Sequence, residues 1–477
     1  MNILKLIKNE MEEEFDYNLD DYEHKYHEKL DGLKIKKFDE SSIEKIVKKS
    51  NEGYQTYRDM PSTSRANILF KASSMLKELK NEVAEIISLE AKKPIKLARI
   101  EVERSVTALK FSAVECLKIE GESIPLDAAP GGESRENIIK LEPLGVVYAV
   151  TPFNFPLMLA IHKIGPALAI GNSVIIKPSE KTPFSVIILN YIFKKSGLPK
   201  NVMQIVTGNG EEITNSLLKM NEIKKVSFTG SVPVGKSIKS KVGLRKLTLE
   251  LGSTSPVYID KSIRNLDEIA DKVVNGAFSY NGQVCISTQK VLIHQEIFEN
   301  LKNLILDKTK GLKYGDPLAE DTDYSDLIDE KSQERIKNWI EDSVSKGAEI
   351  LIGGETHKGG ITPTVITGTN NNMTICSNEI FGPVMILEAV RDSDNLVNIL
   401  NDSDYGLNVG VFTNNLKTAL HLGNKLDYGQ VLINDVPTLR FDNMPYGGRK
   451  NSGYGVEGIK YAIREMAQLK MISLNYQ

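Results

Sequence analysis

From residue 145 onward, short apolar runs rich in β-branched residues alternate with helix-length gaps, and this alternation constrains the fold more than any other feature of the chain. Five runs are typical of buried strands, at residues 146–150, 173–177, 202–206, 225–229 and 246–250. Parallel strands need long crossover connections, and strands covered by helices on both faces are apolar throughout. The pattern therefore predicts a doubly wound α/β unit.

A second alternation follows beyond residue 255. We expect a helix near 266–280 and strands at 287–294, 384–390 and 430–434. The predicted fold class is therefore α/β, with two doubly wound, Rossmann-like lobes.

The amino-terminal part of the chain shows a different pattern. Apolar residues between 68 and 87, and again between about 100 and 119, recur every three or four positions, which predicts a helix in each segment. Residues 1–50 are charge-rich without a clear period, with acidic runs at 12–14 and 20–23, and we expect them at the surface. The turn residues of 128–134 predict a loop or a hairpin tip.

Composition excludes several classes of partner. The 477 residues, with 60 basic and 63 acidic side chains, carry a net charge of −3, which gives no general attraction to nucleic acid or to anionic membranes. Prolines interrupt the most apolar region, 145–176, so no membrane-spanning helix is expected there. Three cysteines and no apolar signal segment favour a cytoplasmic protein with a small-molecule partner.

The standard metal and phosphate motifs are absent from the sequence. The six histidines have no ligand spacing, so we predict no metal site. Neither G-x-x-x-x-G-K-[ST] nor G-x-G-x-x-G occurs. Residues 228–235 join a predicted strand to a predicted helix through two glycines, and a helix amino terminus there can bind a pyrophosphate. An ordinary βα turn explains the same residues equally well.

Two side chains combine reactivity with a favourable place. Cys285 follows an Asn-Gly turn and precedes a strand, so its thiol is expected at the mouth of a cleft. Cys116 lies in a helical pattern and is expected to pack in the core, whereas Cys376 stays ambiguous. Glu250 ends a strand at the carboxyl edge of the sheet, where α/β folds bind ligands, and a half-buried carboxylate there can act as a general base. It can also simply cap a helix.

Seven segments together resemble the aldehyde dehydrogenase superfamily, in the order in which that family carries them. They are Thr151-Pro-Phe-Asn-Phe-Pro156, Ile176-Lys-Pro-Ser-Glu180, Phe228-Thr-Gly-Ser231, Leu249-Glu-Leu-Gly252, Gly282-Gln-Val-Cys285, Glu379-Ile-Phe-Gly-Pro383 and Pro445-Tyr-Gly-Gly448. The resemblance runs from about residue 60 to the end of the chain.

The resemblance implies oxidation of a small aldehyde to a carboxylic acid. Cys285 matches the nucleophile that forms a thiohemiacetal and then a thioester. Asn154 matches the side-chain donor to the oxyanion, together with the backbone N–H of the nucleophile. Glu250 matches the carboxylate that activates the hydrolytic water, and members that transfer the acyl group to coenzyme A commonly lack it.

The same resemblance implies NAD or NADP as cofactor. The matching positions are Lys177 and Glu180 at the adenosine ribose, Ser231 at the pyrophosphate, Glu379 and Phe381 at the nicotinamide ribose, and Thr151, Phe153, Gly230 and Gly252 nearby. Glu180 suits a ribose 2′-OH and repels a 2′-phosphate, which favours NAD. Ser253 stands where the family usually has glycine, so we expect a shift in cofactor placement or rate.

The substrate side resembles the subgroup acting on short hydroxy-, phospho- or phosphono-aldehydes, including lactaldehyde and non-phosphorylating glyceraldehyde-3-phosphate dehydrogenases. Arg104, Phe155 and Arg440 are the implied substrate contacts. An arginine often precedes the nucleophile in that subgroup, and here the residue is Val284. We therefore expect a short hydroxyaldehyde, or a semialdehyde held by one of the arginines. A surface ion pair explains each arginine equally well.

The family also implies a homo-oligomer, either a tetramer or a dimer. Residues 122–143, read as two strands around a Pro-Gly-Gly turn, and 459–477 match its small β oligomerisation arm. The predicted NAD-binding domain then covers 1–121 and 144–250, and the catalytic domain covers 251–458.

Three alternatives stay open at this point: an acyl-coenzyme A-forming dehydrogenase, a cysteine hydrolase, and an inactive scaffold that binds a nucleotide. No histidine lies near Cys285 in the sequence, which weighs against the hydrolase.

Overall fold

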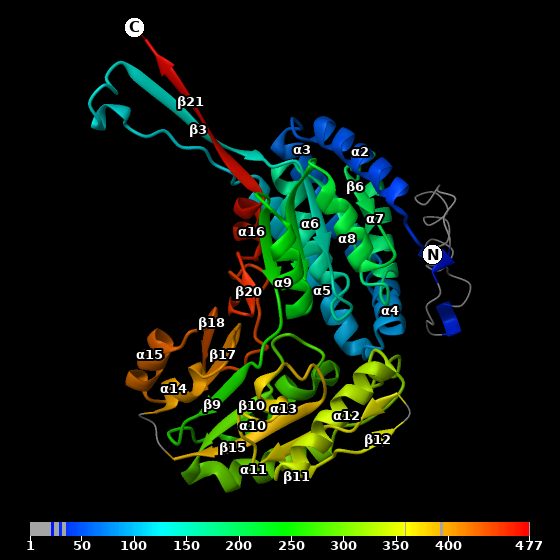
Figure 1. The fold of residues 1–477 in the computed structure, drawn as a ribbon, viewed down its shortest axis with the longest axis vertical. Helices are drawn as coiled ribbons and strands as arrows, with labels where there is room; N and C mark the ends of the chain where they lie inside the picture. Colours follow the sequence, from blue (N-terminus) through cyan, green and yellow to red (C-terminus); the bar gives the residue numbers. More distant parts are fainter. Residues whose placement is uncertain (1–20, 23–27, 31–34, 358, 392–394, 477) are drawn as a thin grey trace.

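The molecule consists of two stacked α/β lobes and a two-stranded arm that projects from the upper lobe (Figure 1). The computed structural model describes residues 21–22, 28–30, 35–357, 359–391 and 395–476. The acidic runs expected at the surface near 12–14 and 20–23 fall largely outside these residues. Within the described part of the chain, no helix has both the length and the apolar character needed to cross a membrane.

The upper lobe is built on a six-stranded sheet with the order β20-β8-β7-β4-β5-β6. Its strands are β4 (Val146–Val150), β5 (Ser173–Lys177), β6 (Met203–Ile205), β7 (Ile223–Thr229), β8 (Lys246–Glu250) and β20 (Gly453–Tyr454). The five strands expected from the sequence are present and parallel. The short β20 returns late in the chain and pairs antiparallel with β8, with Gly453 opposite Glu250.

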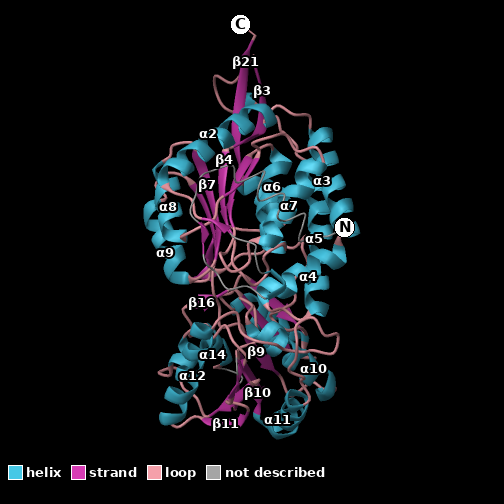
Figure 2. Ribbon diagram, turned by 90° about the vertical axis from the view of Figure 1, so that its right-hand side faces the viewer, coloured by secondary structure: helices cyan, strands magenta, loops and turns pink. Residues whose placement is uncertain are grey.

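Helices cover both faces of this sheet (Figure 2). One face carries α2 (Glu40–Tyr57), α8 (Gly210–Lys219) and α9 (Val232–Lys241). The other carries α6 (Met158–Ile170) and α7 (Phe184–Lys195), and behind them lie α3 (Ser62–Glu78), α4 (Lys80–Ala91), α5 (Ile95–Cys116) and α16 (Ile459–Glu465). As expected, Cys116 is buried between helices, where its thiol contacts the Ala169 carbonyl oxygen at 3.1 Å.

Two expectations for the amino-terminal helices were wrong. The pattern over 68–87 forms two helices rather than one, because the backbone leaves helical geometry at Leu79 (φ −93°, ψ 16°). The expectation of a surface segment without periodic structure over 1–50 fails from residue 40, where α2 begins with Asp39 as its N-cap. Ile43 and Ile46 of α2 are buried against the sheet, and their spacing was too short a signal amid the charges.

The lower lobe contains a seven-stranded sheet with the order β11-β14-β15-β10-β9-β17-β18. Its strands are β9 (Pro256–Ile259), β10 (Lys290–His294), β11 (Glu349–Ile352), β14 (Thr364–Thr367), β15 (Val384–Val390), β17 (Asn408–Phe412) and β18 (Gln430–Ile433). The sheet is parallel apart from β11. This arrangement confirms the predicted α/β class with two Rossmann-like lobes.

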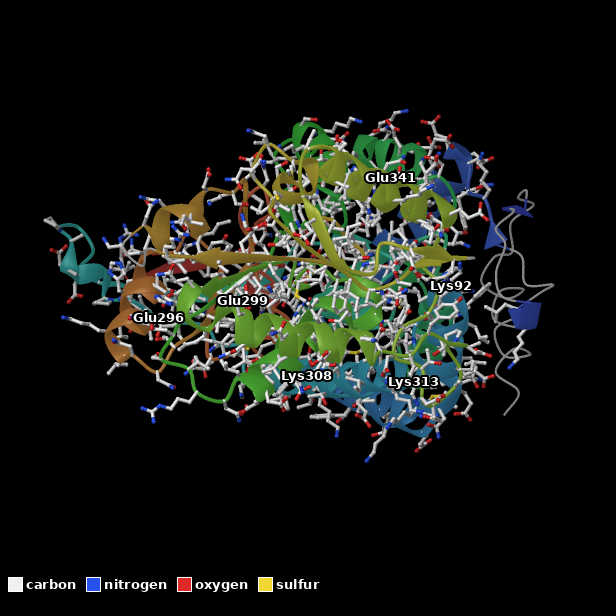
Figure 3. The ribbon with its side chains drawn as sticks, turned by 90° about the horizontal axis from the view of Figure 1, so that it is seen from below. Lys92, Glu296, Glu299, Lys308, Lys313 and Glu341 are labelled. Carbon is white, nitrogen blue, oxygen red and sulfur yellow. The ribbon has the colours of Figure 1, made fainter. Side chains whose placement is uncertain are left out.

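Helices also cover both faces of the lower sheet, with α10 and α11 on one face and α12, α14 and α15 on the other (Figure 2). They are α10 (Leu266–Phe278), α11 (Gln295–Lys310), α12 (Glu330–Ser345), α13 (Thr374–Ser377), α14 (Leu396–Asn401) and α15 (Leu416–Lys425). The outer surfaces are charged: Figure 3 shows Glu296 and Glu299 on α11 and Glu341 on α12. Cys376, left ambiguous by the sequence, is buried in α13.

The arm consists of β3 (Arg135–Pro143) and β21 (Ala467–Asn475), paired antiparallel along their whole length. Of the two strands expected within 122–143, only β3 forms. The segment before it makes a single antiparallel bridge, Glu122 to Ile139, and residues 126–128 form a short 3-10 turn, so the full-length partner of β3 is the carboxyl-terminal strand. Apolar side chains on the arm face solvent, with Ile138 52% and Leu469 69% exposed.

Candidate active site

A cavity of about 490 Å³ opens where the carboxyl ends of the upper strands face the lower lobe. Nineteen residues line it: Pro152, Phe153, Asn154, Leu159, Thr229, Gly230, Ser231, Val232, Pro233, Glu250, Leu251, Gly252, Cys285, Arg335, Trp339, Asn378, Glu379, Phe381 and Tyr405. Segments separated by more than 250 residues thus meet around one space. Nine of the sequence-predicted site residues lie among them, Gly230 of the glycine turn included.

Cys285 reaches the cavity from a loop held in an unusual backbone path. Tyr280 and Asn281 both have left-handed geometry, with φ of 51° and 56°. The Asn281 amide bonds the backbone of Ser325, donating to its carbonyl oxygen at 2.5 Å and accepting from its N–H at 3.1 Å. Burial raises the pKa of the Cys285 thiol to about 11, and the hydrogen bond with Tyr446 acts in the opposite direction. The resting group is therefore a protonated thiol.

Glu250 ends β8 with both carboxylate oxygens buried and without a hydrogen-bond partner among the described residues. Burial raises its pKa well above the usual value, and the nearby Glu457 raises it further, while Arg440 and Lys163 oppose the shift. Lys163 itself is fully buried and binds the Glu457 carboxylate at 2.5 Å. A buried, unpaired carboxyl group on a cavity wall is the usual setting of a general base.

Asn154 is fixed by a second buried ion pair. Its side-chain amide donates to the Gln283 carbonyl oxygen at 2.9 Å, which ties it to the loop of Cys285. The Lys93 ammonium donates to the backbone carbonyl oxygen of Asn154 at 2.5 Å and forms an ion pair with the Glu101 carboxylate, also at 2.5 Å. An amide nitrogen carries two donor hydrogens, and the structure shows one acceptor for them among the described residues, so the other is available to a ligand in the cavity that Asn154 lines.

The opposite wall has the features of a dinucleotide site. Ser231 caps the amino terminus of α9 without a side-chain bond to the helix. Pro233 has no N–H, so the N–H groups of Val232 and Val234 are the ones left in the first turn for a pyrophosphate. A Cβ on Gly252 would lie 2.4 Å from the Glu379 carboxylate, so any larger residue there would require Glu379 to move. Glu379 accepts from the Ser253 N–H at 3.1 Å, and burial raises its pKa to about 7. These groups fit the nicotinamide half of NAD(P).

Three predicted cofactor residues lie outside the cavity wall itself. Lys177 ends β5 and is buried, with its ammonium 3.6 Å from the Glu180 carboxylate. Burial lowers the pKa of Lys177, and Glu180 opposes the shift. Thr151 directly follows β4, and its buried hydroxyl has no hydrogen-bond partner among the described residues. The position of all three at the carboxyl edge of the sheet is the one expected of ligand contacts in such folds.

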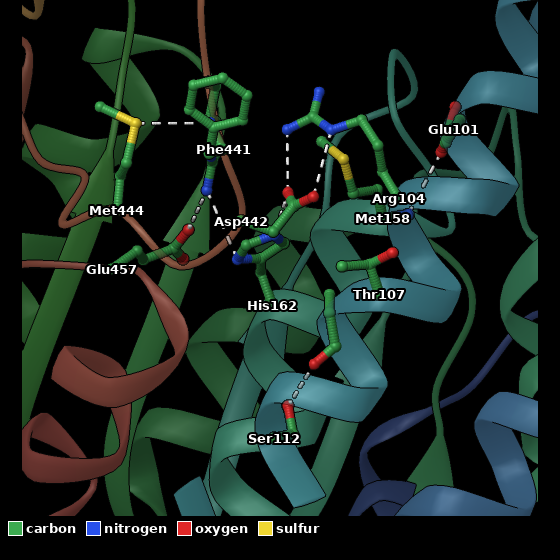
Figure 4. A network of polar contacts seen from close by, with 12 residues as sticks. Glu101, Arg104, Thr107, Ser112, Met158, His162, Phe441, Asp442, Met444 and Glu457 are labelled. Atoms are coloured by element: carbon green, nitrogen blue, oxygen red, sulfur yellow. Dashed lines mark hydrogen bonds and ion pairs between the residues drawn. The ribbon is translucent and has the colours of Figure 1, made fainter. Parts of the chain in front are cut away.

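The predicted substrate residues also lie outside the cavity wall. Figure 4 shows the Arg104 guanidinium beside the Asp442 carboxylate, to which it donates two hydrogen bonds, of 2.9 and 3.3 Å. The same carboxylate lies 3.1 Å from Nε2 of His162. Arg440 is buried, lies 3.9 Å from Glu457 and stacks on the Tyr446 ring at 3.7 Å. The sequence left open whether Arg104 contacts the substrate or forms an ion pair, and the structure shows it in an ion pair with Asp442.

Phe155, the remaining predicted substrate contact, packs edge-on against Tyr280 with ring centres 6.4 Å apart. The Lys93 ammonium lies 3.9 Å from its ring centre. The Phe155 side chain therefore packs against Tyr280 and Lys93, next to Asn154, and does not line the cavity.

Sequence reasoning missed the buried charges behind the site. Lys163 and His162 interrupt the most apolar helix of the chain, α6, and this interruption was the signal that a functional group is buried there. Glu457 carried no comparable signal, since it lies in an irregular segment. Tyr446 stands in the Pro445–Gly448 motif, but nothing in that motif indicated that its hydroxyl group contacts Cys285. Among the described residues, no group of three or more His, Cys, Asp or Glu side chains is arranged to hold a metal.

The fold and the cavity define a class of protein: an α/β enzyme that binds a dinucleotide beside a cysteine, a carboxylate and an amide. Comparison with known proteins gives the family. Residues 25–472 match the model of the aldehyde dehydrogenase family, and the chain belongs to it. It is accordingly an NAD(P)-dependent oxidoreductase that acts on aldehydes.

The relatives cover nearly the whole chain. A lactaldehyde dehydrogenase of Methanococcus aeolicus is 43% identical over 91% of this chain and 93% of its own length. A 3-sulfolactaldehyde dehydrogenase of Priestia aryabhattai is 42% identical over 86% of both chains. Among solved structures, the glyceraldehyde-3-phosphate dehydrogenase of Methanocaldococcus jannaschii complexed with NADP has a TM-score of 0.91 at 34% identity, covering 96% of this chain and all of its own. An NAD+ complex of a Bacillus cereus aldehyde dehydrogenase has a TM-score of 0.89 at 32% identity, covering 93% and 91%.

Proposed function

We propose that the protein oxidises a short hydroxyaldehyde of the lactaldehyde type to the free carboxylic acid, with Cys285 as nucleophile. The observation that carries the proposal is that the Cys285 thiol, the Glu250 carboxyl group and the Asn154 amide line the same cavity. A thiol, a base and an oxyanion donor around one space are the set needed for covalent catalysis through an acyl-enzyme.

The chemistry follows from these side chains. The Cys285 thiol first loses its proton to water. The thiolate then attacks the aldehyde carbon, a C–S bond forms, the carbonyl electron pair moves onto oxygen, and the Asn154 side-chain amide donates a hydrogen bond to this oxyanion. NAD(P), when bound, supplies the hydride acceptor that leaves a thioester on the sulfur. Glu250 then takes a proton from water, the water oxygen attacks the acyl carbon, and the C–S bond breaks with its electrons returning to sulfur. The product is an acid.

Glu250 separates this proposal from transfer to coenzyme A. The carboxyl group lies on the wall of the same cavity as Cys285, and it has no hydrogen-bond partner among the described residues that would divert it from a water molecule. A site that hands its acyl group to an external thiol has no need of such a base.

A neutral hydroxyaldehyde is favoured over an anionic one because the nearby arginines already have partners. The Asp442 carboxylate accepts hydrogen bonds from two nitrogens of the Arg104 guanidinium, Nε and Nη2. Arg440 is buried beside Glu457. An anionic substrate would have to displace Asp442 from a bidentate pair. The second candidate is a sulfonated or carboxylated aldehyde, since one relative is named a 3-sulfolactaldehyde dehydrogenase and Arg104 is still 27% exposed.

We propose NAD as the preferred cofactor, because the Glu180 carboxylate at the edge of the sheet suits a ribose 2′-OH and repels a 2′-phosphate. The Lys177 ammonium at 3.6 Å partly offsets this charge, so NADP use is the alternative.

We also propose a homo-oligomer, either a dimer or a tetramer, assembled through the arm. Its exposed Leu469 and Met471, 69% and 53% accessible, lie on an unpaired strand edge of the kind that natural proteins cover. A cytoplasmic location is the matching proposal for a chain whose three cysteines are all free.

A panel of aldehydes with each cofactor tests the proposal. We expect the highest kcat/KM for lactaldehyde with NAD, above sulfolactaldehyde, succinate semialdehyde and glyceraldehyde 3-phosphate, because that ratio reports differential transition-state binding. Mass analysis of the products with and without coenzyme A must show the free acid in both. Full activity in a Cys285→Ala variant would rule out the assigned nucleophile, and higher efficiency with an anionic aldehyde would favour the second candidate.

A further inference from the structure

The hydroxyl group of Tyr446 is buried next to the sulfur of Cys285, and the reaction proposed above gives it no role. Its oxygen lies 3.2 Å from Cys285 Sγ. Among the described residues, this thiol is the hydrogen-bond partner that the structure shows for the hydroxyl. A buried hydroxyl without a partner is costly, and a phenylalanine would fill the same space without that cost.

Three sets of contacts hold the Tyr446 side chain in its orientation. Two backbone hydrogen bonds, of 3.0 and 2.6 Å, pair Tyr446 with Glu457. The ring packs with Ile286 and Leu407 in a small apolar cluster. The Arg440 guanidinium lies 3.7 Å from the centre of the ring. A cation over a phenol ring withdraws electron density, which strengthens the O–H as a hydrogen-bond donor.

The geometry points to Tyr446 as a further catalytic residue, whose phenolic O–H donates a hydrogen bond to the Cys285 thiolate before attack and again when the sulfur leaves. This inference rests on Cys285 being the nucleophile. Cys285 lines the cavity, whereas Tyr446 is not among the described residues that do so. The hydroxyl group thus contacts the sulfur without being part of the described cavity wall.

The proton and electron balance is simple. On ionisation the thiol proton passes to water, and the phenol keeps its own proton, since burial raises the pKa of Tyr446 well above its usual value. When the C–S bond forms, the sulfur lone pair becomes the bond and the hydrogen bond weakens. When the thioester is hydrolysed, the C–S pair returns to sulfur and the hydrogen bond re-forms.

The other charged groups around the thiol set the background for this effect. Burial is the largest influence raising the Cys285 pKa, and the carboxyl groups of Glu379 and Glu250 add to it. Arg440 and the Tyr446 hydrogen bond lower it. Of the two stabilising groups, the hydroxyl is the one in direct contact with the sulfur.

The test is Tyr446→Phe, which removes one oxygen and keeps the ring under Arg440. A hydrogen bond to a charged group corresponds to about a 10- to 100-fold change in ionisation, so the pKa of Cys285 should rise by about one to two pH units. A higher pKa leaves less thiolate at neutral pH, but the more basic thiolate is also a better nucleophile and recovers part of the lost rate. The net effect should be alkylation by iodoacetamide that is about 3- to 10-fold slower at neutral pH.

The rate of alkylation is followed across pH, with peptide mass analysis to isolate Cys285 from the two buried cysteines. Tyr428→Phe is the matched control: it also removes a buried hydroxyl, one bonded to the Leu400 carbonyl oxygen at 2.7 Å in the lower lobe. It should leave the Cys285 profile unchanged. Thermal melts of both variants check that the fold is intact.

An unchanged or lowered Cys285 pKa in a folded Tyr446→Phe protein would overturn the inference. Because alkylation needs neither aldehyde nor cofactor, this outcome is independent of the proposed reaction. Loss of NAD reduction in Cys285→Ala tests that reaction separately. We also expect kcat to fall in Tyr446→Phe while the KM for NAD stays close to that of the wild type, since the hydroxyl does not line the cavity.

Discussion

Replacing Glu250 by glutamine should separate the two halves of the reaction. The amide has almost the same volume as the carboxyl group, so the wall of the 490 Å³ cavity is kept while the base is lost. A positioned general base contributes about 10²–10⁴ in rate, or about 3–5 kcal/mol of barrier. Attack by Cys285 does not need Glu250 in this scheme. The variant should therefore form the thioester and then hydrolyse it about 10²–10⁴ times more slowly.

Stopped-flow measurement of NADH absorbance should show this as a burst of about one equivalent per Cys285 followed by a slow steady phase. Intact-protein mass spectra should carry the acyl adduct during that phase. Glu388→Gln on β15 is the matched control, because that carboxylate binds Thr369 and neither residue lines the cavity. Its kinetics should equal those of the parent. A Glu250→Gln protein that turns over at the parental steady rate without a burst would refute the assignment of the base.

The pH dependence follows from the same carboxyl group. Burial and Glu457 raise the pKa of Glu250, and only the ionised form can accept a proton from water. Hydrolysis in the parent should therefore rise with pH through this raised pKa and be lost as pH falls below it. In Glu250→Gln this dependence should disappear from the slow phase.

Three further changes test the remaining assignments. Asn154→Ala should lower kcat by about 10²–10³ with little change in the KM for cofactor, and an unchanged kcat would exclude it as oxyanion donor. Glu180→Gln should raise kcat/KM with NADP relative to NAD by about tenfold, the effect of removing roughly 1.4 kcal/mol of charge repulsion. Met471→Glu should reduce the oligomer mass in light scattering, since it places a charge on the proposed interface; an unchanged mass would place the interface elsewhere.

The sequence predicted the sheets well because each strand is specified locally. A buried parallel strand such as β4 is apolar along its whole length, and its neighbours repeat the pattern at helix-length intervals. Helix α2 lacks such a signal: its buried residues lie among lysines and glutamates, and only packing on the sheet makes its apolar stripe visible. The arm fails for a related reason, since the partner of β3 comes from a segment more than 300 residues later.

The site divides in the same way. Cys285, Glu250 and Asn154 stand in motifs whose residue types can be read from the chain. The effect of Ser253 could not be read in this way: its hydroxyl accepts from the Ser255 N–H at 3.1 Å, within its own loop. Ser253 is not among the described residues on the cavity wall, so nothing in the structure supports the expected shift in cofactor placement.

One of the two cations behind the site, Arg440, acts on both reacting groups at once. Arg440 lowers the pKa of Cys285 and of Glu250, and Lys163 also lowers that of Glu250, in each case against the larger effect of burial. Glu457 pairs with Lys163 at 2.5 Å and opposes them at Glu250. A change at Glu457 would therefore alter the base and the cation next to it together. Glu457 lies beside both Lys163 and Arg440 in the buried interior. We therefore expect single substitutions of these three residues to be strongly non-additive in the hydrolytic step.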